Sequence, residues 1–168
     1  GQEPGWKGIV IHLYAGYGNG QLWVTAPDDP YFASYDDYTI ALFEKETRVK
    51  IPVEANDPAR FSKRADWLLA NAKAEWTDWR CEKFLAIHRW TRDRLKATRP
   101  ELELIMYPYD PFIIPAWDEK PEDALPSIFD YGRRGGLDLE KIKDDPGMIL
   151  AMNVTARTDY DAWFAGRD

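Results

Sequence analysis

Aromatic and polar side chains gather at the ends of three apolar segments, GIVIHLY, LELIMY and GMILAMN. Flat aromatic rings can stack on the C–H faces of sugar rings, and carboxylates can bind hydroxyl groups or transfer protons. Asp110 follows the second segment in a tyrosine-rich stretch, so it is the candidate catalytic carboxylate. The residues expected to bind sugar are Tyr17, Trp23, Tyr107, Tyr109 and Asn153.

Each of these residues also has a structural interpretation that the sequence leaves open. Asp110 precedes Pro111 and could cap a turn that this proline begins. The aromatic candidates could pack within loops, and Asn153 could cap a turn. His12 lies inside the first apolar segment, where we expect a hydrogen-bonded core histidine rather than a catalyst.

Helical patterns separate the apolar segments. Ser34 begins the sequence SYDD, which has the form of a capping box, so it is expected to cap a helix over 35–46. An aspartate and a proline at 57–58 predict the start of another helix. Helical character continues over 65–98 and ends before Pro100. The expected apolar face of this last stretch comprises Trp76, Trp79, Phe84, Ile87 and Leu95.

The order of the elements predicts an α/β fold. The three apolar segments are expected to be strands, the first of them buried on both faces, and the short helical sequence GLDLEKIKDDP precedes the third. Helical connections between strands indicate parallel pairing with right-handed crossovers. Such a unit belongs either to an open doubly wound sheet or to part of a (β/α)-barrel. Both architectures collect ligands at the carboxyl ends of their strands, so the candidate residues are expected to share one rim.

The pattern YGNG…SYDDYTIALFEKETRVKIP…AEWTDWRCEKFLAIHRWTRDRLKATRPELELIMYPYD resembles the central part of (β/α)-barrel glycoside hydrolases, above all the family 42 β-galactosidase-like group. The resemblance covers residues 8–110, with weaker support as far as Asn153. It implies a (β/α)8 TIM barrel, with residues 1–168 forming a single partial domain excerpted from a longer chain. It also implies hydrolysis of O-glycosidic bonds in a carbohydrate by a pair of carboxylates.

One position departs from the family pattern. Aligning the Tyr-Gly of AGYGNG with that of the family puts Gly16 where the acid/base glutamate would stand, and glycine cannot transfer a proton. Three interpretations stay open: a shifted alignment in which Asp28 or Asp29 reaches inward, a divergent family whose acid is Asp110, or a carbohydrate-binding or scaffold relative without catalysis. A small flavodoxin-like domain that binds a ligand or a partner is a further alternative from a different class.

Composition and net charge limit the classes of partner that the chain can have. The chain has 168 residues, 45% of them hydrophobic, which suits one domain with a real core. A net charge of −7 with scattered basic residues argues against a nucleic-acid partner, and no apolar run is long enough to span a membrane. Two histidines and the single Cys81, without ligand spacing or a phosphate-binding glycine motif, predict neither a metal nor an organic cofactor. The expected partners are a carbohydrate substrate and the rest of the parent chain, while the compartment stays open.

Overall fold

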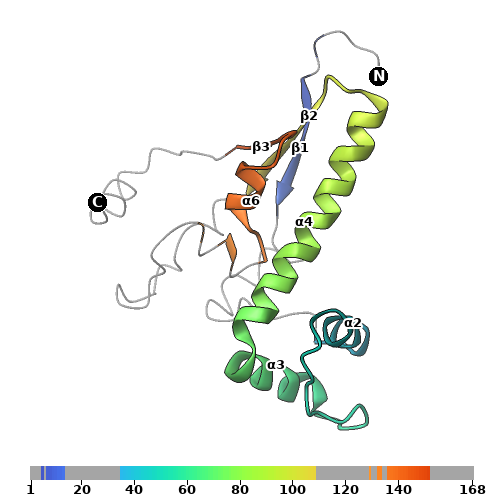
Figure 1. Cartoon of the computed structure of the whole chain (residues 1–168), viewed down its shortest axis with the longest axis vertical. Coiled ribbons are helices and arrows are strands. Elements are labelled where there is room, and N and C mark those ends of the chain that lie inside the picture. Colours follow the sequence, from blue (N-terminus) through green and yellow to red (C-terminus); the bar gives the residue numbers. More distant parts are fainter. Residues whose placement is uncertain are drawn as a thin grey trace, which may run out of the picture.

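The computed structural model contains a small parallel sheet and four helices in its described part (Figure 1). The structure describes residues 5, 7–13, 35–108, 129, 132–133 and 136–151. In chain order the elements are β1 (Gly8–Leu13), α2 (Asp37–Thr47), α3 (Arg60–Asn71), α4 (Lys73–Thr98), β2 (Glu103–Pro108), α6 (Leu139–Lys143) and β3 (Met148–Leu150).

The three strands are parallel and lie side by side in the order β1-β2-β3. The register pairs Val10 with Ile105 and Ile105 with Ile149, so these three side chains form one row across the sheet. One row closer to the carboxyl ends, His12 pairs with Tyr107. The predicted parallel α/β arrangement is confirmed for these strands, because the helices between them return the chain to the same end of the sheet.

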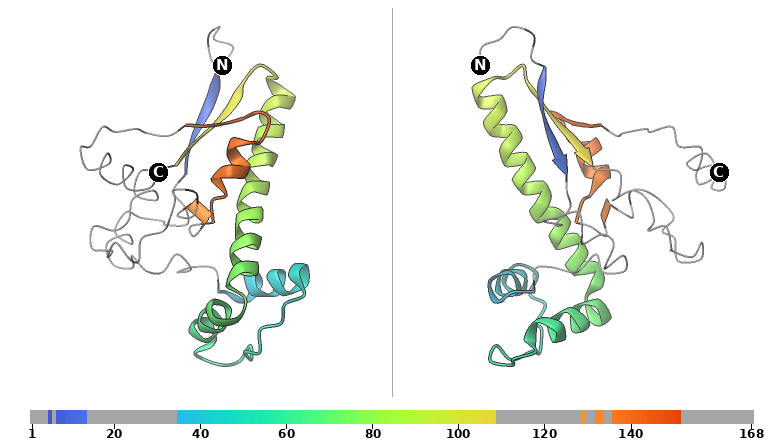
Figure 2. Two further views of the ribbon diagram at one scale, coloured as in Figure 1. Left: turned by 60° about the vertical axis from the view of Figure 1, so that its left-hand side comes forward. Right: turned by 180° about the vertical axis from the view of Figure 1, so that it is seen from behind.

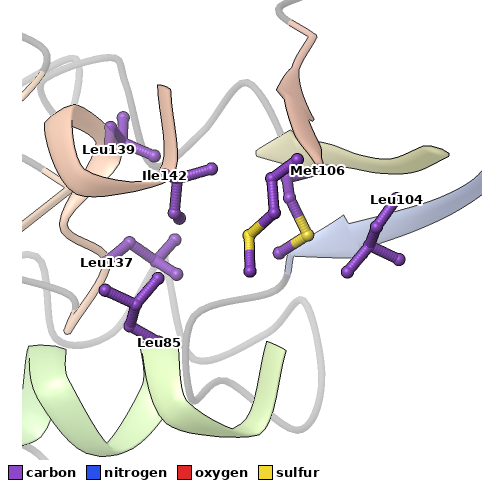
Figure 3. Close-up of a cluster of buried hydrophobic side chains, with 7 residues drawn as sticks. Leu85, Leu104, Met106, Leu137, Leu139 and Ile142 are labelled. Carbon is purple, nitrogen blue, oxygen red and sulfur yellow. The ribbon is translucent and has the colours of Figure 1, made fainter. Parts of the chain in front are cut away.

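Helices α4 and α6 pack on the same face of the sheet (Figure 3). Strand residues of alternating position point to this face, and leucine side chains from both helices meet them. Burying one such aliphatic side chain contributes about 1.5–3 kcal/mol, so this cluster is the main source of stability for the sheet. The buried members are Leu85, Leu104, Met106, Leu137, Leu139, Ile142 and Met148.

The opposite face of the sheet is apolar but open to solvent. Val10 is 50% exposed and Ile149 is 46% exposed, although both are aliphatic residues of strands. The prediction that the first strand is buried on both faces is therefore not met among the described residues, where β1 packs on one face through Ile11. Apolar residue types alone do not show whether a second layer covers a face of the sheet, and no described helix packs on this side.

Helices α2 and α3 and the first turns of α4 form a second core on the side toward which the strands point (Figure 2). Trp76 is fully buried there, with its ring 5.0 Å from that of Phe43 in an edge-to-face contact. The expected helix over 35–46 is confirmed with a small change of bounds, and its residues Ile40 and Phe43 are buried. Its cap is Asp36 rather than Ser34, since the Asp36 carboxylate accepts a 3.0 Å hydrogen bond from the amide of Thr39.

The expected long helix over 65–98 is interrupted at Ala72, which separates α3 from α4. The end of α4 before Pro100 is as expected. The expected apolar face of α4 holds for Trp76 but not for Ile87, which is 62% exposed. Residues at steps of three to five drift around a long helix, and Ile87 falls on the side opposite Leu85.

Candidate functional site

His12 and Tyr107 lie next to each other near the carboxyl ends of the two strands that carry them. Their ring centroids are 4.9 Å apart and the ring planes are inclined by 54°. Ile11 packs into the core beneath the sheet, so alternation along the strand directs His12 to the open face. The His12 side chain is exposed there, and the expectation of a core histidine is wrong.

The pair of rings combines a hydrogen-bonding group with an aromatic one. An imidazole carries two nitrogens that can donate or accept, and a tyrosine adds a hydroxyl to its ring. Tyr107 is half-buried and His12 is more exposed, so the tyrosine supports the imidazole from within the sheet. Below them in the sheet, the side chains of Val10, Ile105 and Ile149 offer only apolar contact. This arrangement suits a ligand with both hydroxyl groups and apolar C–H faces.

Ion pairs hold α2 and α3 together at the same end of the molecule. Arg64 is buried, and its Nη1 donates to the carbonyl oxygen of Tyr35 at 3.1 Å and to Asp37 Oδ1 at 2.7 Å. Arg60 binds the same aspartate through Nε at 3.0 Å. These bonds lower the pKa of Asp37, because two guanidinium groups stabilise its charged form. The segment that enters α2 is therefore fixed to α3.

A second polar contact joins α2 to α4. The indole Nε1 of Trp79 donates a 2.7 Å hydrogen bond to Glu46 Oε2, and Lys83 Nζ donates to the same carboxylate at 2.6 Å. Both donors lower the pKa of Glu46, the lysine bond being the larger cause. Trp79 therefore packs between the helices, and its ring stacks on that of Trp76 with the ring centroids 5.4 Å apart.

Most of the sequence-predicted site lies outside the described residues. Tyr107 is described, and it stands at the carboxyl end of β2 as expected. The remaining candidates, namely Tyr17, Trp23, Tyr109, Asp110 and Asn153, together with Gly16, Asp28 and Asp29, fall in the segments that the structure does not describe. His12 is the site residue that the sequence interpretation missed. The alternation of the strand could have found it, since Ile11 and His12 cannot both face the core.

Two other reactive side chains have structural roles. Cys81 is buried, and burial raises the pKa of its thiol to about 11, so the thiol is protonated at neutral pH and is a poor nucleophile. His88 is buried on α4, with Nδ1 2.8 Å from the carbonyl oxygen of Phe84. A carbonyl can only accept, so Nδ1 carries the proton. Burial lowers the pKa of His88 and favours its neutral form.

Within the described ranges, no group of three or more histidine, cysteine or acidic side chains is arranged to hold a metal ion. The described helices also include none with the length and apolar character required to cross a membrane.

Comparisons of the chain with models of protein families, with curated proteins and with solved structures found no match.

Proposed function

We propose that the three strands form part of the wall of a (β/α)-barrel of glycoside hydrolase type, and that carbohydrate binds at their carboxyl ends. The observation that carries this proposal is the arrangement of the sheet. Three parallel strands follow one another in chain order, and the helices α4 and α6 that connect them pack on one face. A barrel repeats this arrangement around a closed ring, with every helix outside.

The open apolar face supports the same proposal. In a barrel the inward side chains fill the interior in layers, and aliphatic residues predominate among them. The row of Val10, Ile105 and Ile149 has this character on the face opposite the helices. In a doubly wound sheet, by contrast, helices cover both faces. Closure of a barrel would bury the exposed aliphatic surface and remove the cost of leaving it in water.

The resemblance of residues 8–110 to family 42 β-galactosidase-like enzymes supplies the reaction, which is hydrolysis of a glycosidic bond. Barrel active sites lie at the carboxyl ends of the strands, and this is where Tyr107 stands. Under this proposal, Tyr107 supports the sugar and Asp110 is the candidate acid within residues 1–168. A second candidate function is carbohydrate binding without hydrolysis. Gly16 favours it, because glycine stands where the family has its acid/base glutamate.

Titration of the full-length protein with lactose and cellobiose, followed by tryptophan fluorescence and calorimetry, tests the binding proposal. We expect saturable binding of at least one disaccharide, weakened about tenfold or more by Tyr107→Ala, which corresponds to about 1.4 kcal/mol. Tyr38→Ala is the matched control, since Tyr38 is a highly exposed tyrosine of α2. Absence of binding to both sugars, or equal weakening by the two variants, would contradict the proposal.

Release of 4-nitrophenol from 4-nitrophenyl β-galactoside and β-glucoside separates the two candidate functions. Hydrolysis that is lost in Asp110→Asn, with disaccharide binding retained, is the outcome expected for an enzyme that uses this acid. Binding without hydrolysis supports the non-catalytic relative. Hydrolysis that persists in Asp110→Asn would remove Asp110 from any essential acid role.

A further inference from the structure

We infer that His12 binds the sugar directly, with a ring nitrogen hydrogen-bonded to a sugar hydroxyl and the Tyr107 ring holding the imidazole in place. This inference rests on the proposed function and adds a specific residue to the site. It starts from the strand register, which pairs His12 with Tyr107 on the open face.

The backbone determines the direction of the His12 side chain. Ile11 contacts the core cluster that α4 and α6 cover, so its neighbour His12 projects from the other side of β1. The same alternation puts His12 on the face of Val10, one row closer to the carboxyl ends. Under the barrel proposal this direction is inward, toward the mouth of the site.

The contact with Tyr107 limits the orientations that the imidazole can adopt. A centroid distance of 4.9 Å with tilted planes lies within the range of favourable aromatic pairs. Tyr107 directly follows Leu104–Met106, the part of the central strand β2 that pairs with a strand on both sides, so its backbone is the better fixed of the two. A side chain that is oriented before the ligand arrives loses less conformational entropy on binding.

The types of residue on the open face of the sheet indicate that the imidazole of His12 makes the hydrogen bond to the sugar. The neighbouring row across the sheet, Val10, Ile105 and Ile149, has only aliphatic side chains. His12 and Tyr107 are therefore the described residues at this end of the open face that can form hydrogen bonds with a ligand. Sugar hydroxyls both donate and accept, and imidazole nitrogens can match either role.

Three variants of the full-length protein separate the hydrogen bond from the packing. His12→Phe keeps a flat ring against Tyr107 and removes both nitrogens, whereas His12→Gln keeps a donor and an acceptor and removes the ring. Ile149→Val is the control on the same face, away from the carboxyl ends. The Kd for lactose and for cellobiose is measured by calorimetry, and thermal unfolding checks that each variant is folded.

We expect His12→Phe to raise the Kd of the disaccharide that binds by about tenfold, as for the loss of one hydrogen bond. His12→Gln should recover part of this loss, and Ile149→Val should change the Kd less than twofold. A purely structural role predicts the reverse order, with Phe tolerated better than Gln.

Two further outcomes distinguish the inference from the proposed function. If His12→Phe binds like the unmodified protein while Tyr107→Ala binds weakly, the inference is overturned and the carbohydrate proposal stands. If the unmodified protein binds neither disaccharide, both are overturned.

Discussion

Arg89 Nε donates a 2.7 Å hydrogen bond to Asp145 Oδ2, and the Asp145 side chain is only 3% exposed. Arg92 binds the other carboxylate oxygen of the same aspartate. The two arginines belong to α4, whereas Asp145 lies in the turn between α6 and β3. The contact therefore joins α4 to the turn that follows α6.

Replacing Asp145 by asparagine should destabilise the protein. The variant removes a buried negative charge that two guanidinium groups require, and we expect a loss of about 2 kcal/mol in the free energy of unfolding. The measurement is chemical denaturation at neutral pH. Asp93→Asn is the control, because Asp93 also pairs with Arg92 but is 67% exposed, and its loss should stay below about 0.5 kcal/mol. Equal effects of the two variants would contradict this account.

His88 should make the stability of the protein fall between neutral and mildly acidic pH. Its pKa in the folded protein is lowered from the usual 6.5 by burial, so unfolding takes up a proton once the pH is below that value. The contribution of the neutral ring is therefore complete above pH 6.5 and is lost as the pH falls through the folded pKa. The carboxylates with lowered pKa, such as Asp37 and Glu46, lose their contribution only at lower pH, because their usual pKa values are 3.8 for aspartate and 4.5 for glutamate.

Urea denaturation at pH 8.0, 6.5 and 5.5 measures this effect of His88. The free energy of unfolding should decrease from the first pH to the last, and the decrease should be smaller in His88→Gln. A variant whose free energy falls with pH as steeply as that of the unmodified protein would show that another group titrates on unfolding.

Cys81 should resist alkylation in the folded protein. Its thiol is buried and its pKa is raised to about 11, so both access and thiolate formation are suppressed at pH 8. Iodoacetamide labelling followed by mass spectrometry should leave Cys81 unmodified until denaturant is added. Ala86→Cys is the control, since position 86 is exposed on the same helix, and its thiol should react without denaturant. Equal labelling of both cysteines in the folded protein would contradict the buried position.

The elements of the fold could largely be predicted from the sequence, because local patterns determine them. The short helix before the third strand and the end of α4 before Pro100 follow from periodicity and proline geometry. Burial was predicted less well. The exposure of Val10 and Ile87 depends on which element covers each face, and apolar residue types alone do not indicate this.

The candidate site was predictable only in part. Tyr107 was expected at a strand end because parallel strands collect polar and aromatic residues there, and β2 places it so. The apolar neighbours of His12 predict a core position, whereas its contact with Tyr107 depends on a register between segments about ninety residues apart. Alternation along β1 indicates the face of His12, but local patterns do not identify which distant segment pairs with it.

Under the barrel proposal, the open apolar face of the sheet is the interior of the barrel in the full-length protein. Maleimide labelling of single Val10→Cys and Ile149→Cys variants tests it, with Ile87→Cys on the outer side of α4 as the exposed control. Under this proposal the two sheet variants should react as slowly as buried Cys81, whereas Ile87→Cys should react rapidly. Rapid labelling at Val10→Cys and Ile149→Cys in the folded full-length protein would contradict it.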